Sequence, residues 1–123
     1  MTTTTRILTV DDSPSMRALL LHALTKHGFK VEQAEDGQMA LDWLATNEVD
    51  VIITDINMPR LDGFGLIEGL RSSARHSDRP ILVLSTESSD TKKQRARQAG
   101  ATGWIVKPFD AEKLAMAVRR VAH

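Results

Sequence analysis

Short apolar runs alternate with amphipathic stretches along the chain, and this alternation predicts the secondary structure. Apolar runs of four or five residues are typical of buried strands. We expect such strands at residues 6–10, 50–54, 81–84 and 103–106, and a weaker one at 30–34. Each strand is followed by a segment in which apolar residues recur at helical spacing. The pattern therefore predicts five strand–helix units in succession.

The predicted helices carry recognisable start and stop signals. Ser13 and Pro14 form an N-cap and a first-turn proline, and Gly28 ends the helix that they begin. The apolar stripes expected to face the core are Met16, Leu19, Leu20, Ala23 and Leu24; then Ala40, Trp43 and Leu44; then Phe64, Ile67 and Leu70; and finally Leu114, Ala117, Val118 and Val121. The helix expected at 90–99 is polar almost all round, which is typical of a helix that is either marginally stable or used for contacts outside the domain.

Five such units joined by short loops predict a doubly wound α/β domain over residues 1–123, with a parallel sheet covered by helices on both faces. Ligands bind such sheets beyond the carboxyl ends of the strands. The residues just after each strand are therefore the candidates for function. Only one helix follows the last strand, so we expect no DNA-binding or catalytic appendage.

Composition narrows the class of protein. The 123 residues include no cysteine, which excludes disulfides and thiolate chemistry, and the 16 basic and 16 acidic side chains argue against a general nucleic-acid binder. Residues 1–6 contain no apolar signal core, and no apolar run approaches the length of a membrane span. We expect a cytoplasmic monomer without nucleic-acid or membrane partners.

Charge is unevenly distributed along the chain. Residues 1–90 carry a net charge of −6, and residues 91–123 carry +6. Such a division can gather cations at one place and an acidic partner at another. Drift in the composition of exposed helix faces explains the basic end equally well.

Reactive side chains follow four of the predicted strands. Asp11 and Asp12 follow the first strand and Asp55 follows the third, while Ser85 and Lys107 follow the fourth and fifth. If the first and third strands are neighbours, three carboxylates converge, and their mutual repulsion requires either proton uptake or a divalent cation. Oxygen donors without thiolates favour Mg²⁺. Such a site suits the neutralisation of a phosphoryl group delivered to a carboxylate.

Each of these residues also has an ordinary structural interpretation. Asp11 and Asp12 suit a helix N-terminus, and Asp55 suits a turn. Ser85 taken alone is a hydrogen-bonded hydroxyl, and Lys107 taken alone is a solvated lysine. The functional interpretation is favoured because all of them lie at one edge of the expected sheet.

Five motifs in order carry a resemblance to a known family. They are Val10-Asp11-Asp12-Ser13, Thr54-Asp55-Ile56-Asn57-Met58-Pro59 with Asp62-Gly63, Val83-Leu84-Ser85-Thr86-Glu87, Ala99-Gly100-Ala101 and Val106-Lys107-Pro108-Phe109. Over nearly its full length the chain resembles the receiver domain of two-component response regulators, most closely the single-domain chemotaxis type. The resemblance implies a flavodoxin-like fold with strand order 2-1-3-4-5.

The resemblance also implies a role for each site residue. Asp55 would accept a phosphoryl group, assisted by Lys107 and Ser85. Asp11, Asp12, Asp55 and the main-chain carbonyl of Asn57 would hold Mg²⁺, with Asp11 acting through water. Ser85 and Trp104 would form the switch that responds to phosphorylation, Asn57 and Glu87 would tune the lifetime of the phosphoryl group, and the Lys107–Pro108 peptide bond would be cis.

The family's partners follow from the same resemblance. A sensor histidine kinase or a histidine phosphotransfer protein would supply the phosphoryl group. The fourth helix, fifth strand and fifth helix would bind a downstream target such as the flagellar motor switch, through Lys92, Lys93, Arg95 and Trp104. A relay, a phosphate sink and a kinase-regulating receiver remain open alternatives.

Two other classes fit less well, and we expect a signalling protein without enzymatic turnover. A Mg²⁺-dependent aspartyl-phosphate phosphohydrolase usually carries an Asp-x-Asp motif after its first strand, where this chain has Asp11-Asp12-Ser13. A nucleotide or flavin binder needs a phosphate-cradling loop, but the turn at residues 11–15 is acidic and lacks glycine.

Overall fold

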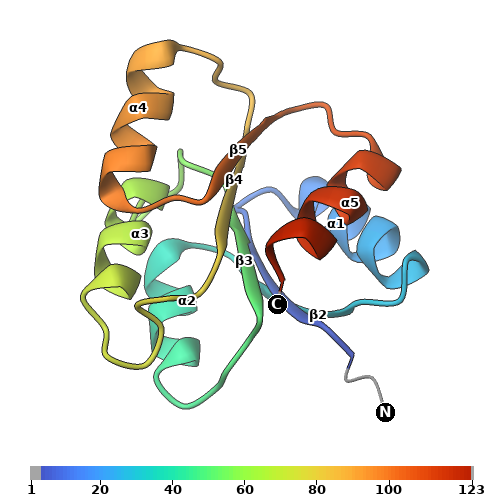
Figure 1. Cartoon of the computed structure of the whole chain (residues 1–123), viewed down its shortest axis with the longest axis horizontal. Helices are drawn as coiled ribbons and strands as arrows, with labels where there is room; N and C mark the ends of the chain where they lie inside the picture. Colours follow the sequence, from blue (N-terminus) through green and yellow to red (C-terminus); the bar gives the residue numbers. More distant parts are fainter. Residues whose placement is uncertain (1–3, 123) are drawn as a thin grey trace.

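A computed structural model describes residues 4–122 and shows a five-stranded parallel sheet in the order β2-β1-β3-β4-β5 (Figure 1). The strands are β1 (Arg6–Val10), β2 (Lys30–Ala34), β3 (Val51–Thr54), β4 (Ile81–Ser85) and β5 (Gly103–Val106). The helices are α1 (Pro14–Lys26), α2 (Gly37–Leu44), α3 (Gly63–Arg71), α4 (Asp90–Ala99) and α5 (Ala111–Val121). The predicted fold class and strand order are confirmed.

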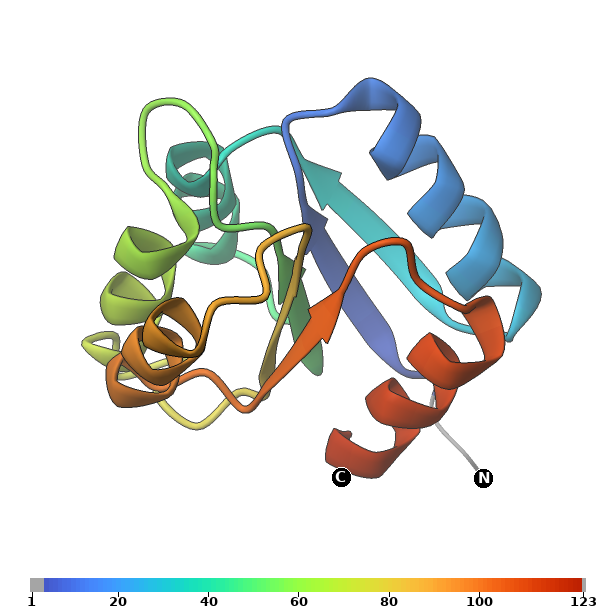
Figure 2. The ribbon, with the colours of Figure 1, turned by 90° about the horizontal axis from the view of Figure 1, so that it is seen from above.

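The helices cover the two faces of the sheet unequally. Helices α1 and α5 lie on one face, and α2, α3 and α4 lie on the other (Figure 2). Strands β3 and β4, both inside the sheet, are buried along their whole length, as expected for strands covered on both sides. The sheet separates two apolar clusters, one around Leu8, Ile52 and Ile67 and the other around Ile7, Ile53 and Leu114.

All five helices begin at a serine or aspartate whose side chain accepts the main-chain N–H three residues further on. These N-caps are Ser13, Asp36, Asp62, Ser89 and Asp110. At the other end, Gly100 closes α4 with a φ of 117°, a left-handed conformation that favours glycine. Local sequence therefore sets where the helices start, and each loop at the carboxyl edge of the sheet has a defined end.

A few predicted positions were wrong. Leu19 is 57% exposed, because the stripe formed by Leu20, Ala23 and Leu24 faces the sheet and Leu19 lies on its flank. On α5 the predicted Ala117 does pack against the core, but the stripe also includes Ala115, which is fully buried and was not predicted. Asp50 lies outside β3, and its Oδ2 accepts the main-chain N–H of Arg6 at 2.8 Å. None of these differences changes the topology.

Two expectations rest on parts of the chain that are only partly described. Residues 1–3, half of the stretch without a signal core, and His123 lie outside the described residues. From residue 4 to residue 122, the helices are too short or too polar to cross a bilayer.

Candidate functional site

Three carboxylates meet at the carboxyl edge of the sheet. Asp11 and Asp12 follow β1, and Asp55 follows β3, which pairs directly with β1 through Val10 and Thr54. One carboxylate oxygen from each aspartate lies within 4.8 Å of the others. The predicted convergence of Asp11, Asp12 and Asp55 is thus present in the structure.

The backbone around Asp55 is tightly fixed. Its main-chain N–H donates to the carbonyl of Val10 at 2.9 Å, and its Oδ1 accepts the N–H of Ile56 at 2.6 Å. The loop that follows returns closely to this point, because Gly63 donates its N–H to the carbonyl of Ile56. A Cβ atom at Gly63 would collide with the carbonyl oxygen of Asp55. The glycine therefore allows α3 to start directly against the backbone of Asp55 and Ile56.

Lys107 reaches the same place from the end of β5. Its Nζ donates to Asp11 Oδ2 at 2.9 Å and to Asp55 Oδ2 at 3.0 Å, and its side chain is only 9% exposed. Burial by itself lowers the pKa of Lys107, but hydrogen bonds and charge from Asp11 and Asp55 outweigh burial and leave the pKa raised. The expected cis peptide bond between Lys107 and Pro108 is present. Lys107 is therefore a fixed cation between two carboxylates.

The donor set suits a hard divalent cation. Asp11 is buried, Asp55 is partly buried and Asp12 is exposed, so the cluster of three carboxylates is accessible to solvent on the side of Asp12. Mg²⁺ prefers oxygen ligands and retains several waters, which an open pocket permits. Asn57 lies two residues beyond Asp55 in an exposed part of the loop. The expected contribution of its carbonyl remains a prediction.

A chain of hydrogen bonds runs from Ser85 to Trp104. Ser85 is fully buried at the end of β4, and its Oγ accepts the N–H of Glu87 at 3.2 Å. The indole Nε1 of Trp104 donates to the carbonyl of Glu87 at 3.0 Å. Glu87 thus connects the two predicted switch residues. Its carboxylate also pairs with Lys92 at 3.0 Å, which joins the chain to the first turn of α4.

Comparison with known proteins decides the family. The model of the response regulator receiver domain matches residues 7–119. The chain belongs to this family. Its sequence is 41% identical over 114 residues to the response regulator MprA of Mycobacterium sp. (strain KMS), covering 93% of this chain and 49% of that protein. The chain thus spans about half the length of the curated relatives it matches.

Solved structures support the same assignment. The chemotaxis response regulator CheY4 of Vibrio cholerae is similar at 44% identity and a TM-score of 0.91, covering 97% of this chain and 99% of that one. The receiver domain of the sensor histidine kinase PA1611 from Pseudomonas aeruginosa PAO1 is similar at 25% identity and a TM-score of 0.90, covering 97% and 98%. That structure has a magnesium ion coordinated in its active site cleft.

The groove between α4 and β5 of this receiver domain contains two of the four predicted partner-binding residues. It measures about 230 Å³, and Lys93 and Trp104 line it together with Arg97, which sequence reasoning missed. Lys92, the neighbour of Lys93 in the first turn of α4, does not line the groove and pairs with Glu87. Arg95 does not line this groove, because its guanidinium stacks on the ring of Phe64 in α3, 3.9 Å from the ring centroid. Arg97 is therefore a cation of the groove, and the role of Arg95 in partner binding stays a prediction.

Arg17 is a second residue that the sequence analysis did not single out, and it contacts the backbone beside the carboxylates. Arg17, in the second turn of α1, donates from Nη1 to the main-chain carbonyl of Asp11 at 2.8 Å. A cation one helical turn after the N-cap Ser13 is the only sequence signal that could have indicated it. An arginine at such a position is usually solvated, so the pattern alone does not distinguish this contact.

Proposed function

We propose that this receiver domain accepts a phosphoryl group on Asp55 in a Mg²⁺-dependent reaction and passes the signal to a partner protein at the α4–β5–α5 face. The supporting observation is the position of Asp55. Its carboxylate lies within 4.8 Å of ligand atoms of Asp11 and Asp12, and Lys107 Nζ donates to it at 3.0 Å. A nucleophile, a cation site and a fixed positive charge therefore share one pocket.

The chemistry follows from these groups. A carboxylate oxygen of Asp55 attacks the phosphorus of a phosphohistidine, the phosphorus–nitrogen bond breaks, and the imidazole nitrogen leaves with the electron pair. Asp11, Asp12 and Asp55 would hold Mg²⁺, which neutralises charge on the phosphoryl oxygens when it is bound. Lys107 is already within reach of Asp55 and supplies a second positive charge without reorganisation.

Phosphorylation changes the balance of contacts at Ser85. A phosphoryl group on Asp55 adds negative charge and strong acceptor oxygens. The Ser85 hydroxyl would donate to one of these oxygens and draw the β4–α4 loop toward Asp55. Because Glu87 binds both Ser85 and Trp104, this movement changes the position of the indole. The pocket and the groove beside α4 are thereby coupled as a two-state element.

The groove beside α4 suits an acidic or amphipathic segment of a partner. Lys93 and Arg97 supply positive charge, and Trp104 supplies apolar surface. Similarity to a chemotaxis response regulator makes the flagellar motor switch one candidate target. A histidine phosphotransfer protein or a regulated kinase would use the same chemistry at Asp55. We infer that the domain turns over no external substrate.

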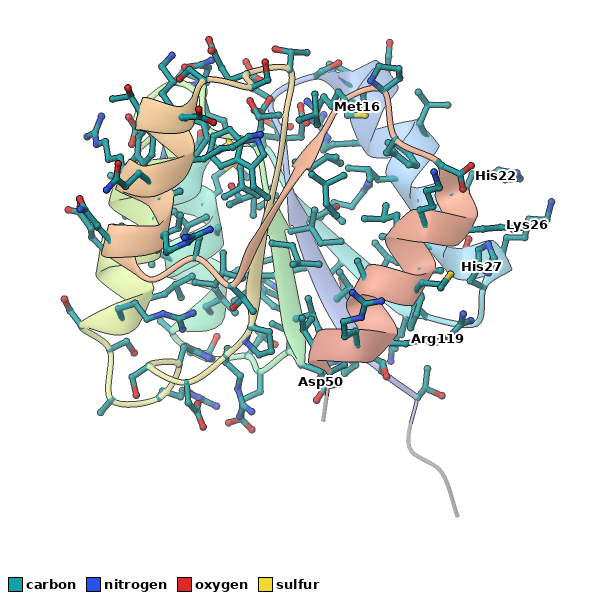
Figure 3. All side chains as sticks on the ribbon, turned by 45° about the horizontal axis from the view of Figure 1, so that its top comes forward. Met16, His22, Lys26, His27, Asp50 and Arg119 are labelled. Atoms are coloured by element: carbon teal, nitrogen blue, oxygen red, sulfur yellow. The ribbon has the colours of Figure 1, made fainter. Side chains whose placement is uncertain are left out.

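The acceptor is tested by mass spectrometry after incubation with acetyl phosphate and Mg²⁺. The wild type should gain one phosphoryl group, and Asp55→Asn should gain none. Asp50→Asn is the matched control, because Asp50 precedes β3 and so lies at the opposite end of that strand from Asp55 (Figure 3). This control should be labelled like the wild type. Comparable labelling of Asp55→Asn would identify another acceptor and overturn the proposal.

The partner face is tested by pull-down with acetyl phosphate present and absent. Reversing charge at Lys92 and Lys93 should reduce capture of the phosphorylation-dependent partner at least severalfold. Reversing Lys26, which is exposed on α1 away from α4, makes a matched control (Figure 3). Unchanged capture by the Lys92/Lys93 variant would exclude this face.

A further inference from the structure

Every acceptor atom of Asp11 is occupied. Oδ1 accepts the N–H of Ser13 at 2.9 Å, and Oδ2 accepts from Lys107 at 2.9 Å. The main-chain carbonyl accepts from Arg17 Nη1 at 2.8 Å. The first two contacts belong to the start of α1 and to the phosphoacceptor pocket. The third has no part in the chemistry proposed above.

Arg17 joins three pieces of the carboxyl edge. Its side chain is only 17% exposed, and Nη2 lies 3.9 Å from Oε1 of Glu35, just beyond β2. Its own main-chain carbonyl accepts from Gln33 Nε2 at 2.6 Å. The backbone of Arg17 is thus held against β2, and its largely buried guanidinium lies beside the exposed carboxylate of Glu35. A guanidinium held in this way can in turn fix the atom to which it donates.

The carbonyl of Asp11 belongs to the peptide group that joins Asp11 to Asp12. This group is planar, so holding its oxygen orients the whole plane and sets the direction in which Asp12 leaves the backbone. The Asp12 carboxylate is exposed, and no other described residue, from 4 to 122, forms a hydrogen bond or ion pair with it. Its position in the pocket therefore depends on the backbone that carries it.

We propose that Arg17 is a positioning residue that orients the Asp11–Asp12 peptide and so directs the Asp12 carboxylate toward the bound cation. This inference rests on the Mg²⁺-dependent function proposed above. The opposing interpretation is that Arg17 merely adds positive charge near the carboxylates. The two interpretations predict opposite changes in Mg²⁺ affinity when Arg17 is replaced. Removing a nearby cation strengthens Mg²⁺ binding, whereas losing the orientation of Asp12 weakens it.

The test is a Mg²⁺ titration followed by amide chemical shifts of the full chain. Arg17→Met should raise the dissociation constant for Mg²⁺ about tenfold, within the range typical of residues that orient metal ligands. Arg17→Lys keeps the charge and one donor, and should recover most of this loss. Lys26→Met removes the same charge from the exposed last turn of α1 and should stay close to the wild type (Figure 3).

A second measurement separates positioning from general damage to the fold. The rate of phosphorylation by acetyl phosphate should fall in Arg17→Met at low Mg²⁺ and return toward the wild-type rate at saturating Mg²⁺. Damage to the fold would lower the rate at every Mg²⁺ concentration. If Arg17→Met does not fold, Arg17→Leu, which also lacks a donor, takes its place in both measurements.

The outcomes distinguish this inference from the proposed function. Equal or tighter Mg²⁺ binding by a folded Arg17→Met or Arg17→Leu protein would overturn the positioning role while leaving the acceptor site intact. Failure of the wild type itself to bind Mg²⁺ would overturn both proposals.

Discussion

Lys107 and Lys92 each pair with carboxylates, but their surroundings differ sharply. Lys107 is 9% exposed and bridges Asp11 and Asp55. Lys92 is 40% exposed and pairs with Glu87, which is itself 35% exposed. Buried charges must be paired because water cannot compensate them, whereas exposed pairs exchange readily with solvent. The first lysine therefore fixes the geometry of the phosphoacceptor pocket, and the second is free to exchange Glu87 for a partner's carboxylate.

The same division extends to the elements that carry these lysines. The carboxylates follow β1 and β3, whose residues Leu8, Val10, Ile52 and Ile53 are almost completely buried. Helix α4 buries only Ala96. The phosphoacceptor pocket is built on the core of the sheet, while the partner face is built on the helix least attached to it. A local chemical change can thus move α4 without disturbing the pocket.

Among the variants that test this comparison, Lys107→Met should have the largest effect on the free energy of unfolding. Removing one partner of a buried pair leaves its carboxylates uncompensated, so we expect the free energy of unfolding to fall by about 3 kcal/mol at pH 7 without divalent ions. Urea unfolding followed by circular dichroism measures the loss, and Mg²⁺ should recover part of it. A loss below about 1 kcal/mol would show that the Lys107 contacts are as weak as exposed pairs.

Arg71 is the next test, because it anchors the carboxyl end of α4. It donates to the carbonyl of Gly100 from Nε at 3.0 Å and Nη2 at 2.7 Å, and also to the carbonyls of Ser77 and Arg79. Arg71→Met should cost about 2 kcal/mol, since partly buried carbonyls lose a charged donor. Hydrogen exchange should accelerate most at residues 96–102. Uniform acceleration over α3 and α4 would contradict a local anchor.

A pH series sharpens the Lys107 result. The pKa of Lys107 is raised in the folded protein, so its protonated form is stabilised by folding. That contribution is complete below the unfolded lysine pKa of about 10.4 and is lost as the pH rises through the higher folded value. The difference in unfolding free energy between the wild type and Lys107→Met should therefore shrink at alkaline pH. A difference in unfolding free energy that grows above pH 10 would contradict a raised pKa of Lys107 in the folded protein.

The sheet and its pocket were predictable because their determinants are local. A β-branched run such as Val51-Ile52-Ile53-Thr54 indicates a buried strand, and an aspartate directly after it must lie at the carboxyl edge. Parallel topology then brings Asp11, Asp12 and Asp55 together. The strand order itself came from the family resemblance, because periodicity does not determine which strands are neighbours.

The parts that could not be predicted depend on side-chain direction. Helical spacing locates the centre of an apolar stripe but not its flank, so Leu19 was misplaced. Charge counting marks α4 as basic, yet it cannot show that Arg95 turns to Phe64 while Arg97 lines the groove. The contact from Arg17 to the Asp11 carbonyl depends on a rotamer, which leaves no trace in the spacing of residues.

The smallest expected effect completes the comparison. Lys92→Met should change the free energy of unfolding by less than about 0.5 kcal/mol, because a pair exposed at both ends is weakened by solvent and by the entropy of ordering two side chains. Urea unfolding at low and high salt measures this, with Lys107→Met as the contrasting variant. A loss above 1 kcal/mol would make Lys92 a structural residue. A negligible change in unfolding free energy combined with weaker partner capture would assign Lys92 to binding. An ion pair with Glu87 that does not stabilise the fold can be exchanged for a partner's carboxylate without loss of stability.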